Sequence, residues 1–173
     1  DGNEYTGYPI MPAGYALNKV ICLSKKDWIK VLSEGDPVLD IHVPKGGKLA
    51  KDQCDSSFRR AMEFFPDYFP EFLFRGFTCY SWLLDPQFQE LLPPTSNIVQ
   101  FQKRFHVFPI LSDDRATFDN VFNGLPTDLT RAPKDTSLRR AILDHMMNGG
   151  YFHSAGGFIL NEEIDAISTT TLC

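Results

Sequence analysis

The sequence predicts an α/β domain built around a mixed sheet that is flanked by helices. Two observations carry this prediction. Segments in which apolar and polar residues alternate recur along the 173 residues, and segments with apolar residues at helical spacing lie between them. Clusters of proline and glycine separate the two kinds of segment. A chain of this length forms one domain with its own core, or one half of a larger two-domain protein.

The first third of the chain is expected to hold two strands and a short helix. Residues 1–14 are rich in Gly, Pro and Tyr, which is typical of an irregular segment. Residues 15–23 alternate as a strand does, and Ser24 then caps a helix over residues 25–32. A Gly-Asp-Pro turn leads into a strand over residues 38–43.

In the middle of the chain, apolar runs are separated by prolines. One apolar stripe at helical spacing predicts a helix over residues 52–65; it comprises Cys54, Phe58, Ala61, Met62 and Phe65. Pro66 and Pro70 are expected to end this helix. The aromatic run 72–82 predicts a central strand, and Asp85-Pro86 is a typical start for the next helix.

The last third is expected to add three helices and two strands. Pro109 restricts its strand to an edge of the sheet or to a bulge. Capping and alternation signals predict a helix from Ser96, a strand at 106–111 and a helix at 115–122 that ends at Asn123-Gly124. They also predict a helix to about Met147 that is capped by Asp135 or Thr136, and a strand at 151–160. A polar, loose tail is expected over residues 166–173, so the folded domain is expected over residues 15–165.

Composition excludes several classes of protein. The formal net charge of −5 argues against a nucleic-acid-binding surface, which is usually basic. No run approaches the roughly 18 apolar residues of a membrane span, and no signal peptide is recognisable. The four Cys and four His lack paired metal-ligand spacing, so we expect no metal, reduced thiols and a cytoplasmic location. Because the chain starts with Asp1 rather than Met, we expect it to be a domain of a longer protein.

The stretch VLDIHVPKGGKL, residues 38–49, holds the candidate ligand site. Asp40 and His42 share one face of the predicted strand. Lys45, Gly46 and Gly47 follow, where glycines let the backbone approach a ligand and amides near a helix start can face a phosphate. The alternative is a simple chain reversal, because Pro-x-Gly-Gly is ordinary turn chemistry.

Four segments carry a resemblance to a known family: VLDIHVPKGGKL, SFRRAMEFF, CYSWLLDPQFQELLPPTSNIVQFQKRF and LPTDLTRAPKDTSLRRAILDHMMNGG. Together they resemble the GNAT-like C-terminal domain of bacterial acyltransferase-like proteins, over about residues 37–160. The run from Ser81 to Gln102 is the most specific part, because a match of that length rarely arises by chance. The resemblance implies a GNAT-like mixed sheet, acyl-CoA or acetyl-CoA as cosubstrate, and a separate N-terminal acyltransferase-associated domain as partner.

The resemblance also implies where the cosubstrate binds. In the GNAT order, residues 38–43 are the strand that splays from its neighbour to admit the pantetheine arm. The pyrophosphate then lies against the following turn, which implies contacts at Val43, Lys45, Gly46 and Gly47. The usual GNAT loop reads Arg or Gln, two residues, Gly, one residue, and Gly or Ala. This chain departs from that spacing, with a lysine and adjacent glycines.

Acyl transfer from a thioester to an amine needs a base for the amine and an acid for the departing thiolate. Asp40 and His42 are the candidate bases; the alternative is a structural histidine beside a solvated aspartate. Tyr80 is the candidate acid, because GNAT enzymes often use a tyrosine; the alternative is a ring packed at the sheet edge. A Cys79 nucleophile is not favoured, since no histidine follows at motif spacing.

Arg139 and Arg140 open the helix after the proline-containing loop and are candidate phosphate ligands, although an exposed helical face explains them equally well. The predicted function is N-acyl transfer from acyl-CoA to a small-molecule amine. The rival interpretation is a non-catalytic GNAT-like module that binds a partner domain or a small ligand. Neither interpretation includes a nucleic-acid or membrane partner.

Overall fold

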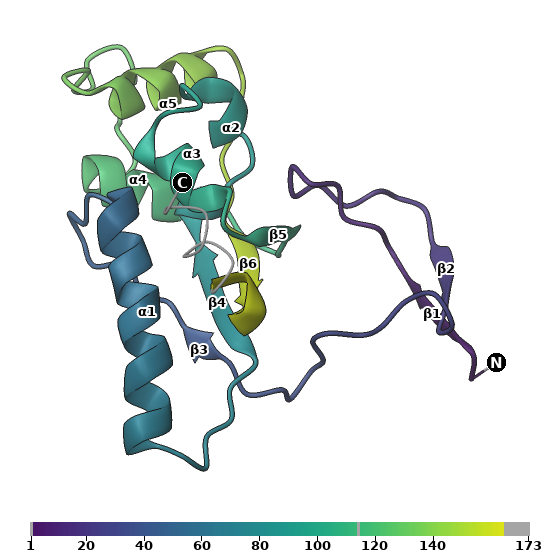
Figure 1. Cartoon of the computed structure of the whole chain (residues 1–173). Helices are drawn as coiled ribbons and strands as arrows, with labels where there is room; N and C mark the ends of the chain where they lie inside the picture. The colour runs from purple at the N-terminus through teal and green to yellow at the C-terminus, as the bar shows by residue number, and fades with distance from the viewer. Residues whose placement is uncertain (1, 114, 165–173) are drawn as a thin grey trace.

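A four-stranded mixed sheet forms the centre of the computed structural model, which describes residues 2–113 and 115–164 (Figure 1). Its strands are β3 (Leu39–Asp40), β4 (Gly76–Ser81), β6 (Ala155–Leu160) and β5 (His106–Pro109), in that spatial order. β3 runs parallel to β4, whereas β6 is antiparallel to both β4 and β5. The predicted mixed sheet is therefore confirmed, with β5 at an edge as its proline requires.

The two central strands approach each other closely at Gly76, which pairs with Leu160. A Cβ atom added at Gly76 would lie 2.3 Å from the carbonyl oxygen of Ile159. Only glycine fits this position, because the backbone that it would strike cannot rotate away.

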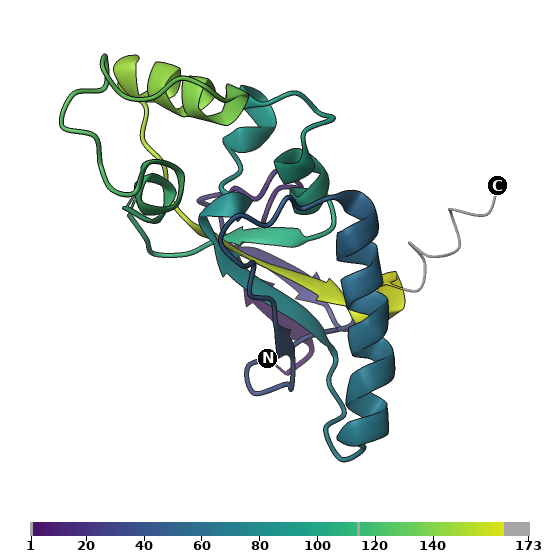
Figure 2. The ribbon, with the colours of Figure 1, turned by 90° about the vertical axis from the view of Figure 1, so that its left-hand side faces the viewer.

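Helix α1 (Lys51–Tyr68) covers one face of the sheet (Figure 2). The predicted stripe faces inward, because Phe58 is buried and its neighbours along the stripe pack on the same core. The prediction that Pro66 ends the helix is wrong, since the helix continues to Tyr68 and the Phe69 amide still donates to Phe65 O at 2.8 Å. A proline in the last turn removes only its own N–H donor, so the cost is smaller than in mid-helix.

An ion pair holds the start of α1 against the rest of the domain. The Arg104 guanidinium contacts the carboxylate of Asp55, which also accepts a hydrogen bond from Lys51 Nζ at 2.8 Å. Burial raises the pKa of the Asp55 carboxyl, but the hydrogen bonds from Arg104 and Lys51 outweigh burial and bring the pKa below its ordinary value. The pair therefore stabilises the fold above the ordinary carboxylate pKa, and its contribution is lost as the pH falls through the lowered value.

Five of the other helical segments gather around a second apolar cluster that includes Phe88, Phe118 and Phe152. They are the 3-10 turn η1 and four α-helices, namely η1 (Trp82–Leu84), α2 (Phe88–Leu91), α3 (Asn97–Gln102), α4 (Arg115–Phe122) and α5 (Ser137–Met147). The predicted caps are confirmed: Ser96 Oγ accepts from the Val99 amide, and Thr136 Oγ1 accepts from the Arg139 amide. The predicted helix after Asp85-Pro86 is present but only one turn long.

The N-terminal third differs most from prediction. Residues 4–7, expected to be irregular, form β1 (Glu4–Gly7), and only the end of the predicted 15–23 strand is extended, as β2 (Ile21–Ser24). The predicted helix over residues 25–32 is wrong: after one turn closed by the Trp28 amide on Ser24 O, the chain is irregular. A short helix depends on packing an apolar face, and Ile29 here is 87% exposed.

The β1–β2 hairpin lies on the opposite side of the sheet from α1 (Figure 1). Within residues 2–113 and 115–164, no helix covers this second face of the sheet. Tyr80 and Phe108 stand on that face beside Gly156, with their rings edge to face at 6.3 Å, and Tyr80 is 60% exposed. A hollow of about 700 Å³ separates Phe108 and Phe158 from the hairpin and residues 28–34.

Two sequence-based expectations concern the membrane and the tail. Within residues 2–113 and 115–164, no helix combines the length and the apolar character that crossing a bilayer requires. The loose tail expected at 166–173 lies outside the described residues.

Candidate functional site

The candidate site begins where β3 and β4 separate. The two strands pair only through Leu39 with Phe77 and Asp40 with Thr78. The Ile41 amide makes one more hydrogen bond, to Thr78 O at 2.7 Å. The strand predicted over residues 38–43 thus pairs over only two residues, and beyond Ile41 the main chain leaves the sheet. Such a parting of parallel neighbours opens backbone edges that a ligand can contact.

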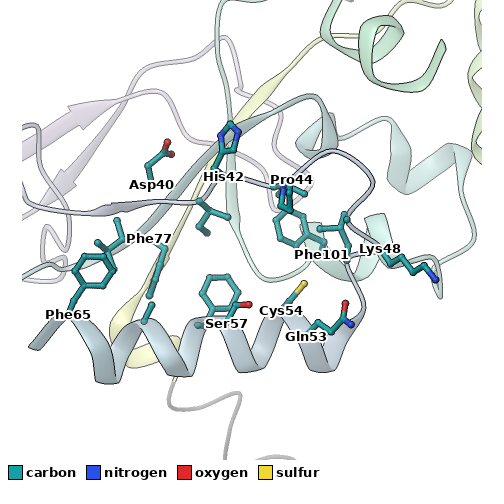
Figure 3. Close-up of a pocket in the computed structure, with 17 residues that line it drawn as sticks. Asp40, His42, Pro44, Lys48, Gln53, Cys54, Ser57, Phe65, Phe77 and Phe101 are labelled. Atoms are coloured by element: carbon teal, nitrogen blue, oxygen red, sulfur yellow. The ribbon is translucent and has the colours of Figure 1, made fainter. Parts of the chain in front are cut away.

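The side chains around this parting divide between two faces. Leu39, Ile41 and Val43 pack on the core under α1. Asp40 and His42 are exposed and point away from α1 (Figure 3). Asp40 pairs with Thr78, so Tyr80, two residues further along β4, lies on the same face as Asp40. The structure therefore brings the three predicted catalytic residues to one side of the sheet.

The turn after β3 has the geometry that its glycines predict. The Gly47 amide donates to Pro44 O at 2.9 Å, which closes a four-residue turn. Gly46 occupies its third position with φ +82°, a conformation that side chains strongly disfavour. Nothing lies within 4 Å of a Cβ built on Gly46, so this side of the turn is open.

Main-chain donors at the turn are only partly available. The Gly47 amide is used within the turn, whereas the Lys45 and Gly46 amides make no hydrogen bond to any described residue. The start of α1 adds further donors, because Ala50 at its N-cap provides no side-chain acceptor. Lys45 and Lys48 are exposed beside these amides, and Lys45 Nζ donates a hydrogen bond to Asn123 Oδ1 at 3.1 Å.

Two cavities flank residues 43–49. The first, here named the apolar groove, has a volume of about 370 Å³ and lies between α1 and the residues of β3 and the turn, with the rings of Phe77 and Phe101 in its wall (Figure 3). The second, here named the polar hollow, has about 250 Å³ and is lined by the turn together with Trp82, Asn97 and Asn120. Neither cavity could be predicted from the sequence, since their walls come from segments far apart in the chain.

The two candidate arginines are held by protein groups. Arg139 donates to Val121 O at 2.9 Å and to Asp135 Oδ1 at 2.8 Å, and Arg140 donates to Lys134 O at 2.8 Å. Neither lines the groove or the hollow. Their contact with a phosphate stays a prediction.

Metal ligands were not expected from the sequence. Among residues 2–113 and 115–164, no three His, Cys, Asp or Glu side chains are grouped as a metal ion requires.

Cys79 is expected to be inert toward alkylating reagents in the folded protein. Burial, with a further effect of the Asp40 carboxylate, raises the pKa of its thiol to about 12. At pH 8 the reactive thiolate is then rarer than in an ordinary cysteine by roughly 1,000-fold. Mass spectrometry after iodoacetamide treatment should find Cys22, which is exposed, modified long before Cys79. Equal labelling of both thiols in folded protein would contradict this environment.

Comparisons with known proteins place this geometry in context. Residues 15–159 match the family described as GNAT-like C-terminal domain. A solved acyltransferase in complex with decanoyl-CoA is 34% identical, with a TM-score of 0.67, and the match covers 75% of this chain and 42% of that one. An acyltransferase in complex with CoA and 10C-Teicoplanin is 32% identical, with the same TM-score and coverage.

A third solved structure, an acyltransferase mutant in complex with octanoyl-CoA, is 31% identical with a TM-score of 0.66, and the match covers 76% of this chain and 43% of that one. This chain therefore spans less than half the length of these acyltransferases. A search of curated proteins found no match.

Proposed function

The chain belongs to the GNAT-like C-terminal domain family, and from this premise we propose that it binds acyl-CoA at the 43–49 turn and transfers the acyl group to an amine. The observation that supports this most directly is the parting of β3 from β4 beside an open turn with free amides. The related acyltransferases were solved with CoA or acyl-CoA, which favours the same class of cosubstrate here. This proposal includes a cytoplasmic setting, because thiols stay reduced there, and a bacterial one, because the resemblance described above is to bacterial proteins.

The residues present fit the chemical groups of CoA. Lys45, Lys48 and the unpaired amides at the turn suit phosphate oxygens. The separated edges of β3 and β4 suit the amides of a pantetheine arm, since both offer unpaired backbone groups. The acyl carbon would then lie within reach of the face that carries Asp40, His42 and Tyr80.

The proposed reaction assigns roles to those three side chains. His42, with Asp40 on the same face, accepts the proton that the amine loses as its nitrogen attacks the thioester carbonyl. The new C–N bond forms as the C–S bond breaks. Tyr80 gives a proton to the departing thiolate, so charge does not build up on sulfur. A free backbone amide near the point where β3 and β4 separate stabilises the oxyanion of the tetrahedral intermediate.

Replacing Gly46 with valine is expected to abolish stabilisation by acyl-CoA. At 100 times the dissociation constant, a ligand stabilises the folded state by about 2.7 kcal/mol, which thermal unfolding detects. A β-branched residue cannot adopt the φ of +82° without strain, so the turn must change shape.

Gly35→Val is the matched control, because Gly35 has φ +86°, nothing lies within 4 Å of its added Cβ, and it lines neither cavity. We expect both variants to lose some stability without ligand and only Gly46→Val to lose the shift. If acyl-CoA raised the melting temperature of Gly46→Val as much as that of the unmodified protein, the cosubstrate would not bind at this turn.

The rival function, a non-catalytic module that binds a partner domain, has one observation in its favour. Among the described residues no helix covers the sheet face opposite α1, and apolar side chains of residues 28–31 are exposed next to it. The two proposals separate on ligand binding: a module without transfer chemistry should show no stabilisation by octanoyl-CoA or acetyl-CoA, with or without the rest of the protein.

A further inference from the structure

Residues 2–34, here named the strap, lie over the sheet face opposite α1 and are held to the domain at two points (Figure 1). Near the middle of the strap, Gly14 is buried against β5, since a Cβ added there would lie 2.7 Å from Val107 Cγ1. At its end, Val31 O accepts a hydrogen bond from Arg75 Nη2 at 3.3 Å, next to the start of β4. Between the strap and the sheet lies the cavity of about 700 Å³, here named the strap hollow.

The strap hollow has mostly apolar walls. Its floor on the sheet is formed by the rings of Phe108 and Phe158, whose centroids are 6.4 Å apart. Trp28, which is 56% exposed, is the largest of the side chains that the strap contributes. Lys30 and Glu34, of opposite charge, both line the hollow, so charge favours neither sign of ligand. The volume lies in the range of small-molecule sites, roughly 300 to 1,000 Å³, so the hollow suits a bulky molecule that bears rings.

The floor of the strap hollow is in register with the candidate catalytic residues. Asp40 pairs with Thr78, and Thr78 pairs with Phe158, so these three side chains lie in one row across β3, β4 and β6. Neighbouring strands are about 4.8 Å apart, which separates Asp40 from Phe158 by about 10 Å. A molecule of ordinary size can therefore bind in the hollow and still reach the candidate bases.

The next row of the sheet connects the hollow to Tyr80. Gly156 pairs with Tyr80 on one side and with Phe108 on the other. A Cβ added at Gly156 would lie 2.4 Å from Phe108 Cε2, so the Phe108 ring occupies the space above the glycine. This brings the ring edge to face with Tyr80, at 6.3 Å between centroids. The aromatic floor of the hollow thus extends without a gap to the candidate acid.

Resting on the proposed function, we propose that the strap hollow binds the acceptor of the acyl group and that this acceptor is an amine carried on an aromatic body. The ring lies between Phe158 and Trp28, and the amine nitrogen reaches His42. The acceptor must come to this face of the sheet, because Asp40 and His42 point toward it, away from α1. The chemistry is unchanged: the nitrogen bonds to the acyl carbon as the C–S bond breaks, its proton passes to His42, and Tyr80 protonates the thiolate.

Other occupants fit the strap hollow less well. A protein partner could lie flat on the floor only after the attachments of the strap at Gly14 and Val31 had broken. A saturated acyl chain would gain from the burial of its area alone. An aromatic body gains in addition from ring geometry, which strengthens binding roughly two- to tenfold.

The kinetic test measures thiol release from acetyl-CoA by the full chain with three acceptors: butylamine, 4-cyclohexylbutylamine and 4-phenylbutylamine. All three carry the amine on the same four-carbon spacer, so only the far end of the molecule differs. We expect kcat/KM for the phenyl compound to exceed that for butylamine on the order of 100-fold, because a whole ring leaves water. It should exceed the value for the cyclohexyl compound roughly two- to tenfold.

Trp28→Ala is the principal variant. Trp28 lies in an irregular segment and belongs to neither apolar cluster, so the variant should fold. We expect KM for 4-phenylbutylamine to rise about tenfold, while kcat, the reaction of butylamine and the affinity for acetyl-CoA stay unchanged. Tyr8→Ala is the matched control, because Tyr8 is a ring of similar exposure, 60%, on the same strap and does not line the strap hollow.

Phe158→Leu tests the preference for an aromatic body. Leucine keeps an apolar side chain in the floor but removes the ring. We expect this variant to accept 4-phenylbutylamine and 4-cyclohexylbutylamine equally well. A preference for the phenyl compound that persists in both Phe158→Leu and Trp28→Ala would place the acceptor elsewhere.

Fluorescence gives a reading of acceptor binding that needs no acyl-CoA. The chain has two tryptophans, so Trp28 is the only one left in Trp82→Phe. In this variant 4-phenylbutylamine should change the Trp28 emission in a saturable manner, whereas butylamine should not. Emission that changes with protein concentration but not with the amine would mean that a second copy of the chain covers the hollow, and would overturn the inference.

The remaining outcomes separate this inference from the proposed function. If acyl-CoA binds but the three amines react equally and leave the Trp28 emission unchanged, this inference is wrong and the proposed function stands. If Trp28→Ala weakens octanoyl-CoA more than acetyl-CoA, the hollow holds the acyl chain and this inference is wrong as well. If no acyl-CoA binds, the proposed function fails, and the acceptor role of the hollow fails with it.

Discussion

Replacing His42 with glutamine is expected to slow acyl transfer by about 100- to 10,000-fold, the usual contribution of a general base. His42 is exposed on the face opposite α1, two residues from Asp40 and directly before the turn. Glutamine keeps a polar side chain of similar reach but cannot accept a proton at neutral pH. Acyl-CoA binding should be retained, because the imidazole is not part of the proposed phosphate contacts.

The measurement is thiol release from octanoyl-CoA in the presence of an amine acceptor. His106→Gln is the control: His106 is also exposed on this face of the sheet but belongs to β5 and pairs with Glu163. A His42→Gln protein with an unchanged rate would assign the base to another residue.

Replacing Asp85 with alanine is expected to destabilise the fold by about 3 to 5 kcal/mol, the cost of breaking a buried charged network by removing one member. The Asp85 side chain is 0% exposed. Its oxygens accept from the Gln87 amide at 3.0 Å and from the His153 amide at 2.9 Å. His153 Nδ1 also lies 2.9 Å from Oδ2, although not in line for a hydrogen bond.

Urea unfolding of Asp85→Ala and of Asp144→Ala, an exposed aspartate on α5, would measure this difference. Alanine at position 85 removes the acceptor of the partly buried amides of Gln87 and His153 and of Gln87 Nε2. At the exposed position 144, water takes the place of the carboxylate. A loss below about 1 kcal/mol for Asp85→Ala would mean that water replaces the carboxylate or that the network is dispensable.

Elements with local signals were predicted well. Ser96 and Thr136 cap their helices as expected, and Asn123-Gly124 ends α4 with both residues at positive φ. These signals act within a few residues, so the sequence alone contains them. The helix expected over residues 25–32 had a cap and an apolar face but no surface to pack against, and that information is not local.

In the candidate site, too, local features could be predicted from the sequence and long-range ones could not. The faces of Asp40 and His42 and the conformation of Gly46 follow from alternation and turn chemistry, and the structure agrees with both. The two cavities and the network of Asp85 were not foreseen. Asp85 and His153 are 68 residues apart, and no spacing rule connects a loop before α2 to the segment before β6.

The bare side of the sheet has a practical consequence for anyone who purifies this domain. Apolar surface that other molecules can contact is exposed here, from the rings of Tyr80 and Phe108 and the side chains of Trp28 and Ile29. Concentrated samples are therefore expected to self-associate. Because hydrophobic association weakens on cooling, purification at low temperature and low protein concentration should improve the yield.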